Sequence, residues 1–340
     1  MAETTTHGGR FDWIDWMKAL GIYLVVLGHF NTVGNQFVYV FHVPLFFVIS
    51  GFLCKRECDG RLFWQKLWYN LAVPMLMLAT LNYAYYCALK LYYGTFELVQ
   101  VYWFVRNVLF GMMSGFGPLW FVYTLILLKI IYQYCTHNSV FYVLTVPFLG
   151  LSVLYNHYDL SGTPFFLKAP NVIVNICTAF PFFALGIFLH KYKMRLHEWD
   201  NKLMLLATFV CGLSLTVVCY HFNGFVALFR CDYGDHLLLF LIGGVAGTMM
   251  VFALSKLLGG APKVVEIISR GTIIILGLHI NAVLLIQEAC PVWLALLYAV
   301  MIIMVLVPVI ILIERYFPLM AGKYRVSKSN VGNKMMDTCP

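Results

Sequence analysis

The sequence predicts an all-α polytopic membrane protein with about ten transmembrane helices and both termini in the cytoplasm. Three observations lead to this prediction. The 340 residues are 61% hydrophobic and only 11% charged, whereas soluble domains are about 45–50% apolar and about 25% charged. The apolar residues gather in ten runs, each near the roughly 20 residues that cross a bilayer. The Lys and Arg residues are distributed unequally between alternate connections.

The ten apolar runs take up most of the chain. They lie near residues 19–33, 37–54, 67–92, 117–135, 139–155, 171–190, 202–221, 235–256, 271–288 and 291–314. No cleavable signal pattern precedes the first run, so we interpret it as an uncleaved anchor. The stretch 101–114 is short and contains Arg106 and Asn107, which predicts an interfacial or re-entrant helix. We expect a short cytoplasmic tail at 1–10, one transmembrane domain at 11–317 and a basic cytoplasmic tail at 318–340.

The basic residues predict the orientation. All but four of the 23 Lys and Arg residues fall in one set of alternate connections, and the exceptions are Lys90, Arg106, Lys168 and Arg230. The positive-inside rule assigns the richer set, with both termini, to the cytoplasm. The net charge of +8 then faces anionic headgroups of membrane lipids, and nucleic-acid binding has no support. The ten cysteines show no paired CxxC spacing, and we expect no metal site.

Polar residues in the first two runs form a candidate site. Lys18 and His29 are eleven residues apart, which returns them to nearly the same helix face about 16 Å apart along the axis. His42 should lie at a depth similar to that of His29, because only about seven residues separate the two helices. Ser50-Gly51 lets a backbone or an extended ligand come close. Ionisable groups inside spans are costly, so they mark packed polar sites or pathways.

Each of these residues also has an ordinary structural explanation. An intramembrane histidine is as often a hydrogen-bonding group between helices as a catalyst, and a lysine at the membrane surface commonly snorkels. A Ser-Gly pair is more often a helix-packing contact than a ligand site. Taken singly, these residues decide little, and only their combination predicts a site.

Three features carry a resemblance to a known family. A basic residue is followed, after ten residues, by a histidine, here Lys18 and His29. The segment 41–53 reads FHVPLFFVISGFL and looks like the FHMPLFFFISG segment of the family, while Gly117-Pro-Leu-Trp120-Phe121 is similar to its LWF motif. A weaker similarity is Leu278-His279 in the ninth run. With these features the chain resembles the acyltransferase-3 family of bacterial integral-membrane acyltransferases, particularly its sugar O-acetylase-like members.

The resemblance implies an O-acyltransferase of the bacterial cytoplasmic (inner) membrane. Its donor would be cytoplasmic acyl-CoA, most simply acetyl-CoA, and no metal would be needed. The acceptor would be a hydroxyl of a carbohydrate, such as a cell-surface glycan, a glycolipid or a precursor of either. Polysaccharide-biosynthesis proteins are then the expected protein partners.

This activity suggests roles for the candidate residues. A thioester is already activated, so the enzyme chiefly needs a base for the hydroxyl proton, a donor for the carbonyl oxygen and cations for the donor phosphates. We expect His29 to be the base, while His42 is catalytic by orienting the acceptor, assisting His29 or stabilising the oxyanion; these alternatives stay open.

The donor side should involve several cations. We expect Lys18, Arg61, Lys66 and Ser50 to contact acyl-CoA, within a collar that includes Arg10, Lys55 and Arg56. The family often has paired arginines in the loop and helix start after the second span, whereas this chain has Arg61 and Lys66, followed by Asn70, there.

We count Asp15 and Trp120 as substrate-binding residues. Asp15 lies one helical turn before Lys18 and is expected to pair with it. Trp120 offers an aromatic face to a sugar. A histidine near the end of the chain, His279, is as consistent with packing as with a place in the cavity.

A transport function is the alternative. A flippase or exporter of polysaccharide or glycolipid also needs many spans and a polar path. Transporters commonly contain internal repeats and paired broken helices, and the sequence shows no convincing repeat.

Overall fold

The described part of the chain is built from helices. The computed structural model describes residues 10–30, 35–110, 117–135, 137–158, 172–286 and 291–323. Within these ranges, the β-type backbone pairing consists of an isolated antiparallel bridge between Ala227 and Asp232. The all-α prediction is therefore confirmed.

The helices follow one another with short connections. In chain order they are α1 (Asp12–Gly28), α2 (Asn35–Tyr39), α3 (His42–Phe52), α4 (Gly60–Leu67), η1 (Trp68–Ala72), α5 (Val73–Tyr92), α6 (Val99–Phe110), η2 (Gly117–Leu119), α7 (Trp120–Tyr134), α8 (Asn138–Val143), α9 (Thr145–His157), α10 (Val172–His190), α11 (Lys193–Glu198), α12 (Lys202–Asn223), η4 (Leu228–Arg230), α13 (Leu237–Leu258), α14 (Lys263–Arg270), α15 (Thr272–Ile286), η5 (Val292–Leu294) and α16 (Ala295–Tyr316).

Every expected span overlaps a helix or two consecutive helices. Within the described ranges, five helical segments are long and apolar enough to cross a bilayer, namely Gly60–Tyr92, Asn138–His157, Lys202–Asn223, Leu237–Leu258 and Ala295–Tyr316. A sixth candidate is the pair α14 and α15, which is bent by 83° at its break. The structure thus supports a multi-pass membrane protein, and the count of ten spans stays a prediction.

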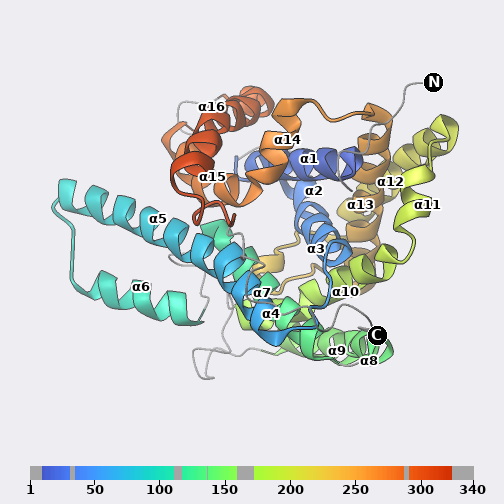
Figure 1. The fold of residues 1–340 in the computed structure, drawn as a ribbon, viewed down its shortest axis with the longest axis horizontal. Coiled ribbons are helices and arrows are strands. Elements are labelled where there is room, and N and C mark those ends of the chain that lie inside the picture. Colours follow the sequence, from blue (N-terminus) through green and yellow to red (C-terminus); the bar gives the residue numbers. More distant parts are fainter. Residues whose placement is uncertain are drawn as a thin grey trace, which may run out of the picture.

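Helix α1 lies at the centre of the molecule. It packs against α2, α3, α13, α14, α15 and α16. In Figure 1, α1 and α3 occupy the middle, between α14–α16 on one side and α12 and α13 on the other. Asp15 and Lys18 on α1 therefore lie among neighbouring helices and do not face lipid on an outer helix.

The second run is divided into two helices, and the break positions a candidate residue. Helix α2 ends at Tyr39 and α3 begins at His42. Pro44 lies in the first turn of α3, where its missing N–H leaves no helix hydrogen bond unmade. His42 Nδ1 is 2.7 Å from the carbonyl oxygen of Val38 in α2. This hydrogen bond crosses the break and sets the direction of the imidazole ring.

Two glycines hold α3 close to α10. A methyl group on Gly51 would collide with the carbonyl oxygen of Phe183, and one on Gly186 would collide with the carbonyl oxygen of Val48. The two backbones can approach only because neither residue has a Cβ. Gly51 is thus a helix-packing residue, while its neighbour Ser50 faces the other way.

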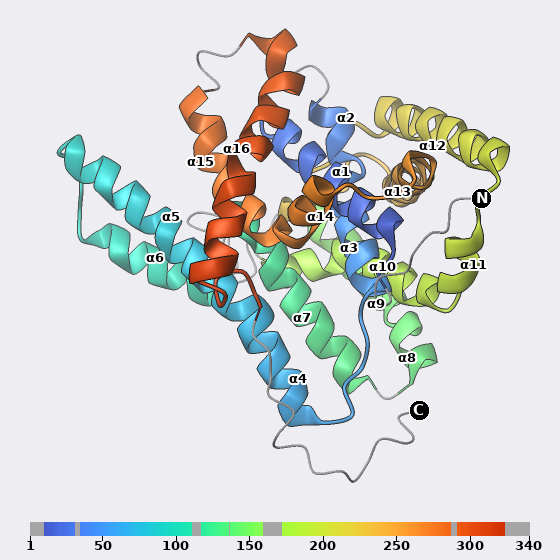
Figure 2. The same cartoon turned by 45° about the horizontal axis from the view of Figure 1, so that its top comes forward.

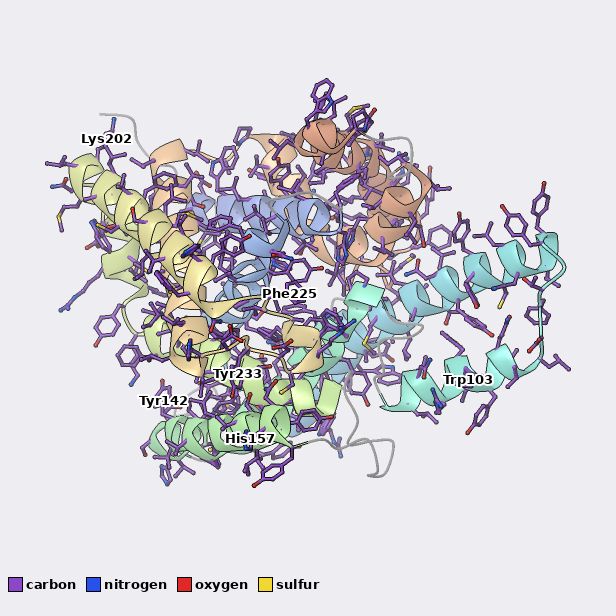
Figure 3. The ribbon with its side chains drawn as sticks, turned by 180° about the vertical axis from the view of Figure 1, so that it is seen from behind. Trp103, Tyr142, His157, Lys202, Phe225 and Tyr233 are labelled. Carbon is purple, nitrogen blue, oxygen red and sulfur yellow. The ribbon has the colours of Figure 1, made fainter. Side chains whose placement is uncertain are left out.

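Helices α5 and α6 form a hairpin that extends away from the body (Figures 1 and 2). The rings of Tyr83 and Phe104 stack between the two helices at 4.1 Å. Trp103 lies on α6, well away from the main bundle (Figure 3). The stretch 101–114, expected to be an interfacial or re-entrant helix, is helical over 101–110, within α6, and 111–114 lie outside the described residues.

The segment between α12 and α13 is folded over the bundle, as Phe225 and Tyr233 show in Figure 3. The amide of Asn223 holds it, donating to the carbonyl oxygen of Tyr233 and accepting from the N–H of His236, each at 2.7 Å. Helix η4 lies within this segment.

Candidate active site

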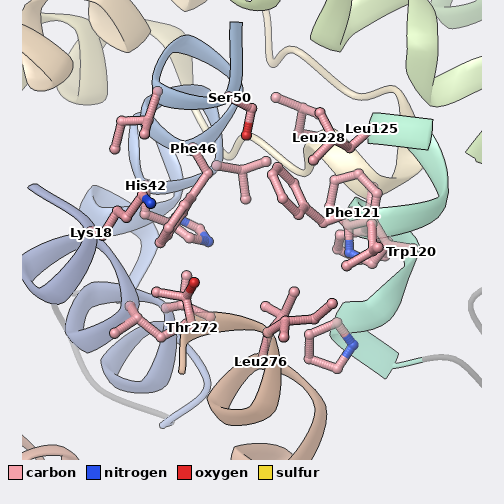
Figure 4. Close-up of a pocket in the computed structure, with 18 of the residues that line it drawn as sticks. Lys18, His42, Phe46, Ser50, Trp120, Phe121, Leu125, Leu228, Thr272 and Leu276 are labelled. Atoms are coloured by element: carbon pink, nitrogen blue, oxygen red, sulfur yellow. The ribbon is translucent and has the colours of Figure 1, made fainter. Parts of the chain in front are cut away.

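A cavity of about 560 Å³ lies between α1, α3, α7 and α15. Figure 4 shows Lys18 and His42 on one side, Trp120 and Phe121 opposite, and Thr272 and Leu276 of α15 along the edge. Most of the wall is apolar. The polar and aromatic lining includes Lys18, His29, Tyr39, His42, Phe46, Ser50, Trp120, Phe121, Lys129, Phe229 and Thr272.

The cavity has two chemically different ends. At one end, Lys129 Nζ lies 3.5 Å from Sγ of Cys54, which follows the end of α3. This contact places Lys129 beside Leu53, the residue before Cys54, and both Leu53 and Lys129 line the cavity. At the other end, beside the start of α3, the Tyr39 ring meets the His42 ring edge-on at 4.9 Å. The first end is cationic, and the second is aromatic and contains the histidines.

Among the described residues that line the cavity, Lys18 and Lys129 are the charged ones, and none is acidic. The Lys18 ammonium group makes no hydrogen bond or ion pair with any residue that the structure describes, although Asp15 is near enough to interact electrostatically. A largely enclosed ammonium group costs free energy unless an anion accompanies it. The cavity is therefore suited to an anionic ligand.

Hydrogen bonds define the state of two histidines. His42 Nδ1 lies 2.7 Å from the Val38 carbonyl oxygen, and His279 Nδ1 lies 2.8 Å from that of Ile275. A carbonyl oxygen only accepts, so each Nδ1 carries a proton. In a neutral ring Nε2 is then an acceptor. His29 follows α1 directly, and its ring centroid is 5.0 Å from that of His279.

A second pocket, of about 340 Å³, adjoins the cavity and shares Lys18 and Leu53 with it. Its remaining lining residues are Arg10, Phe11, Ile14, Asp15, Phe52, Lys55, His190, Lys193, Ser269 and Arg270. The Lys and Arg residues of this pocket come from four segments of the Lys- and Arg-rich set, which the positive-inside rule assigns to the cytoplasm. We call this the basic pocket.

Arg10 is fixed in the basic pocket by acidic partners. Its Nε donates to the Asp15 carboxylate at 2.5 Å, and its guanidinium is 3.8 Å from Glu266. Ser269 Oγ donates to the other Asp15 oxygen at 2.6 Å. The hydrogen bond to Asp15 raises the pKa of Arg10, so this cation stays charged. The expected pairing of Asp15 with Lys18 is wrong, because Arg10 and Ser269 take up both carboxylate oxygens.

The structure brings together five of the eight candidate residues. Lys18, His29, His42, Ser50 and Trp120 all line the cavity, and Asp15 lines the basic pocket.

Arg61 and Lys66 lie outside both cavities, on α4. The segment before α4 runs along the end of α7, where Gln133 bonds to the backbone of Glu57. Lys66 pairs with Glu57 at 2.7 Å. Of the expected collar, Arg10 and Lys55 line the basic pocket, and Arg56 is bonded to the carbonyl oxygen of Tyr132 instead.

Sequence reasoning missed several lining residues. The sequence does mark Lys129, because it is an ionisable residue inside an apolar run. No sequence pattern marks Thr272 and Phe229, because remote segments bring them to the cavity. His279 contacts His29 only through the packing of α15 against α1. In the described ranges, no group of three or more His, Cys, Asp or Glu residues is arranged to hold a metal ion.

The fold and site define a multi-pass membrane protein with a largely apolar cavity into which two lysines and two histidines project. A family model described as an acyltransferase domain, acyltransferase-3, matches residues 11–314. This match covers nearly the whole chain, so the chain belongs to the acyltransferase-3 family, and the resemblance in its first two runs is confirmed. Comparison with curated proteins and with solved structures gave no match.

Proposed function

We propose that the protein transfers a short acyl group, most simply acetyl, from cytoplasmic acyl-CoA to a carbohydrate hydroxyl. The observation that carries this proposal is that the two cavities adjoin, sharing Lys18 and Leu53 in their walls. His29 and His42 line the same cavity as Lys18, and Lys18 also lines the basic pocket. An anionic donor held in the basic pocket can therefore extend toward the two imidazoles.

The donor side suits a coenzyme with phosphates at one end and a thioester at the other. Arg10, Lys55 and Lys193 in the basic pocket can bind phosphate groups, since charge-assisted hydrogen bonds to phosphate are strong. Lys18 and Lys129 then line the path of the pantetheine arm. About 16 Å of helix separates Lys18 from His29, a span that an extended arm of comparable length covers.

The proposed reaction is a direct transfer. His29 takes the proton of the acceptor hydroxyl while its oxygen attacks the thioester carbonyl carbon. The new C–O bond forms, the C–S bond breaks, and the CoA thiolate receives the proton from His29. The products are an ester and free CoA. His42 carries its proton on Nδ1, so its Nε2 is an acceptor that can orient the hydroxyl, which favours this role over oxyanion stabilisation.

The aromatic end of the cavity suits the acceptor. Trp120, Phe229 and Tyr39 line it, and the Trp120 and Phe229 rings are 6.4 Å apart. Aromatic faces can pack against the apolar faces of sugar rings, and a tyrosine hydroxyl adds a polar contact. Donor and acceptor would then meet from opposite sides of a bacterial inner membrane, in a chain of about ten spans with cytoplasmic termini. The acceptor would be a surface glycan, a glycolipid or a precursor.

Labelled acyl-CoA tests the proposal directly. We expect purified protein in lipid nanodiscs to release CoA and label glycan only when both substrates are present. His29→Gln should lower turnover about 10²- to 10⁴-fold, because it removes the general base. His221→Gln is the matched control, since His221 is exposed on α12 and lines neither cavity. Wild-type turnover in a folded His29→Gln protein would exclude His29 as the base.

Export without acyl transfer is the second candidate. One observation favours it, namely the 83° break between α14 and α15, because transporters often form their sites at broken helices. The same nanodisc experiment separates the two functions, since an exporter consumes no acyl-CoA. Labelled glycan crossing a vesicle membrane without CoA release would support export and contradict the acyltransferase proposal.

A further inference from the structure

We propose that His279 is a positioning residue for His29. Its Nε2 accepts a hydrogen bond from one ring nitrogen of His29 and leaves the other nitrogen of His29 facing the cavity as the acceptor. The inference rests on the proposed function only in its predicted effect on kcat. The contact itself can be tested without any substrate.

The first support is an unused acceptor in the core. His279 is completely buried, and its Nε2 has no hydrogen-bond partner among the residues that the structure describes. Its Nδ1 already donates to the Ile275 carbonyl oxygen, so Nε2 has a lone pair and no proton. A buried acceptor without a partner costs free energy and calls for an explanation. A donor from His29 would supply one.

The second support is the position of His29. Its ring centroid is 5.0 Å from that of His279, a separation at which rotation of the rings can bring one nitrogen of each within hydrogen-bond reach. The His29 side chain makes no hydrogen bond with any residue that the structure describes, and it lines the cavity. His279 is absent from the cavity lining. It therefore lies behind His29, where a supporting residue belongs.

The chemistry explains why a neutral partner is useful here. A base that takes a proton becomes an imidazolium with two N–H groups, and the second needs an acceptor in the protein. In hydrolases of the Ser-His-Asp type a carboxylate fills this role. Among the described residues, no acidic side chain lines this cavity. His279 Nε2 accepts from His29 throughout the cycle, while His279 keeps its own proton on Nδ1 and only His29 gains and loses one.

Two substitutions at position 279 separate positioning from packing. His279→Phe keeps a ring but removes the acceptor, whereas His279→Gln can offer an amide oxygen near the place of Nε2. We expect His279→Phe to lower kcat about 10- to 100-fold, as loss of a supporting hydrogen bond to an active group commonly does. The KM for acyl-CoA should stay within about twofold, because the basic pocket is untouched. His279→Gln should recover most of the lost kcat.

Val283→Ala is the packing control. Val283 is fully buried on α15, one turn beyond His279, and lines neither cavity. Its kcat should match that of the wild type. A wild-type kcat in His279→Phe, or equal losses in the Phe and Gln variants, would overturn the inference.

Nitrogen NMR of the wild-type protein makes the test independent of turnover. With ¹⁵N-histidine in nanodiscs, we expect a coupling through the hydrogen bond between His279 Nε2 and a ring nitrogen of His29, assigned with His29→Gln. Absence of this coupling overturns the inference even if every variant loses activity. If the wild type shows the coupling but no acyl-CoA turnover, the proposed function fails and the histidine contact stands.

Discussion

Lys18 is the residue that most constrains the ligand of the cavity. It lies on the central helix, lines both the cavity and the basic pocket, and forms no ion pair with a described residue. Its carboxylate neighbour, Asp15, is taken up by Arg10 and Ser269. Because an enclosed ammonium group without a counter-ion is unfavourable, Lys18 is best explained by a negatively charged ligand.

Replacing Lys18 should therefore affect donor binding more than chemistry. Lys18→Met keeps the length of the stem and removes the charge. We expect the KM for acyl-CoA to rise about tenfold or more, because a hydrogen bond to a charged group contributes about 1.5–3 kcal/mol. The kcat at saturating donor should change much less. Initial rates over a range of acyl-CoA concentrations give both constants.

Lys202→Met provides the control for Lys18→Met. Lys202 is exposed at the start of α12 and lines neither cavity, so its removal should leave both constants unchanged. An unaltered KM in Lys18→Met would remove Lys18 from donor binding.

At the scale of elements, the contact between α3 and α10 supports one wall of the cavity. The two helices approach at Gly51 and Gly186, where backbone atoms take the place of side chains. Ser50, next to Gly51, faces the cavity. The packing of α3 against α10 therefore sets the position of the polar residues on the opposite face of α3.

A single methyl group should disturb this contact. Gly51→Ala would push Cβ into the carbonyl oxygen of Phe183, and we expect a loss of about 1–3 kcal/mol, typical of overpacking. Gly150→Ala in α9 is the matched control, because nothing lies within 4 Å of a Cβ at that position. Thermal unfolding in the same detergent compares the two. A Gly51→Ala protein as stable as Gly150→Ala would contradict the close approach.

The break between α14 and α15 has a related effect. The 83° bend ends the amphipathic α14 near the basic pocket and starts α15 with Thr272 at the cavity. The four residues from Ser269 to Thr272 therefore lead from the basic pocket to the cavity. His279 lies on the same helix, seven residues after Thr272, and reaches His29 from there.

At the scale of the whole molecule, the arrangement of charge agrees with the expected orientation. The basic pocket draws residues from four connections of the set rich in Lys and Arg. The aromatic end of the cavity lies beside η4, where Arg230 is one of the few basic residues of the other set. With the predicted orientation, the two ends of the path would face opposite sides of the membrane.

Single cysteines can test this orientation. We expect Glu97→Cys, between α5 and α6, to react with a membrane-impermeant maleimide in intact cells. Glu198→Cys, in α11, should react only after the membrane is opened, because the positive-inside rule assigns its connection to the cytoplasm. Both glutamates are exposed. Labelling of the native cysteines is the background, and it is measured on the unaltered protein. If Glu198→Cys reacts in intact cells and Glu97→Cys reacts only after the membrane is opened, the predicted orientation is wrong.

The site was predictable where residues are close in sequence. The spacing of Lys18 and His29 places both on one face of α1, and the short connection to α3 brings His42 to the same cavity. The structure places Arg61 and Lys66 outside both cavities, because the segment before α4 runs along α7, and their contact with a donor stays a prediction. Prediction failed for the partner of Asp15, since a carboxylate binds the best placed donors, and Arg10 folds back to it.

The sequence by itself determined the helices, the class of membrane protein and the stripe of polar residues on α1, because hydrophobicity and helical periodicity are local properties. The tertiary structure alone decided which remote groups complete the site. Lys129, Phe229, Thr272 and His279 come from segments far apart in the chain. They meet Lys18, His29 and His42 only through packing, since contacts between distant helices depend on how their surfaces fit and leave no regular spacing in the sequence.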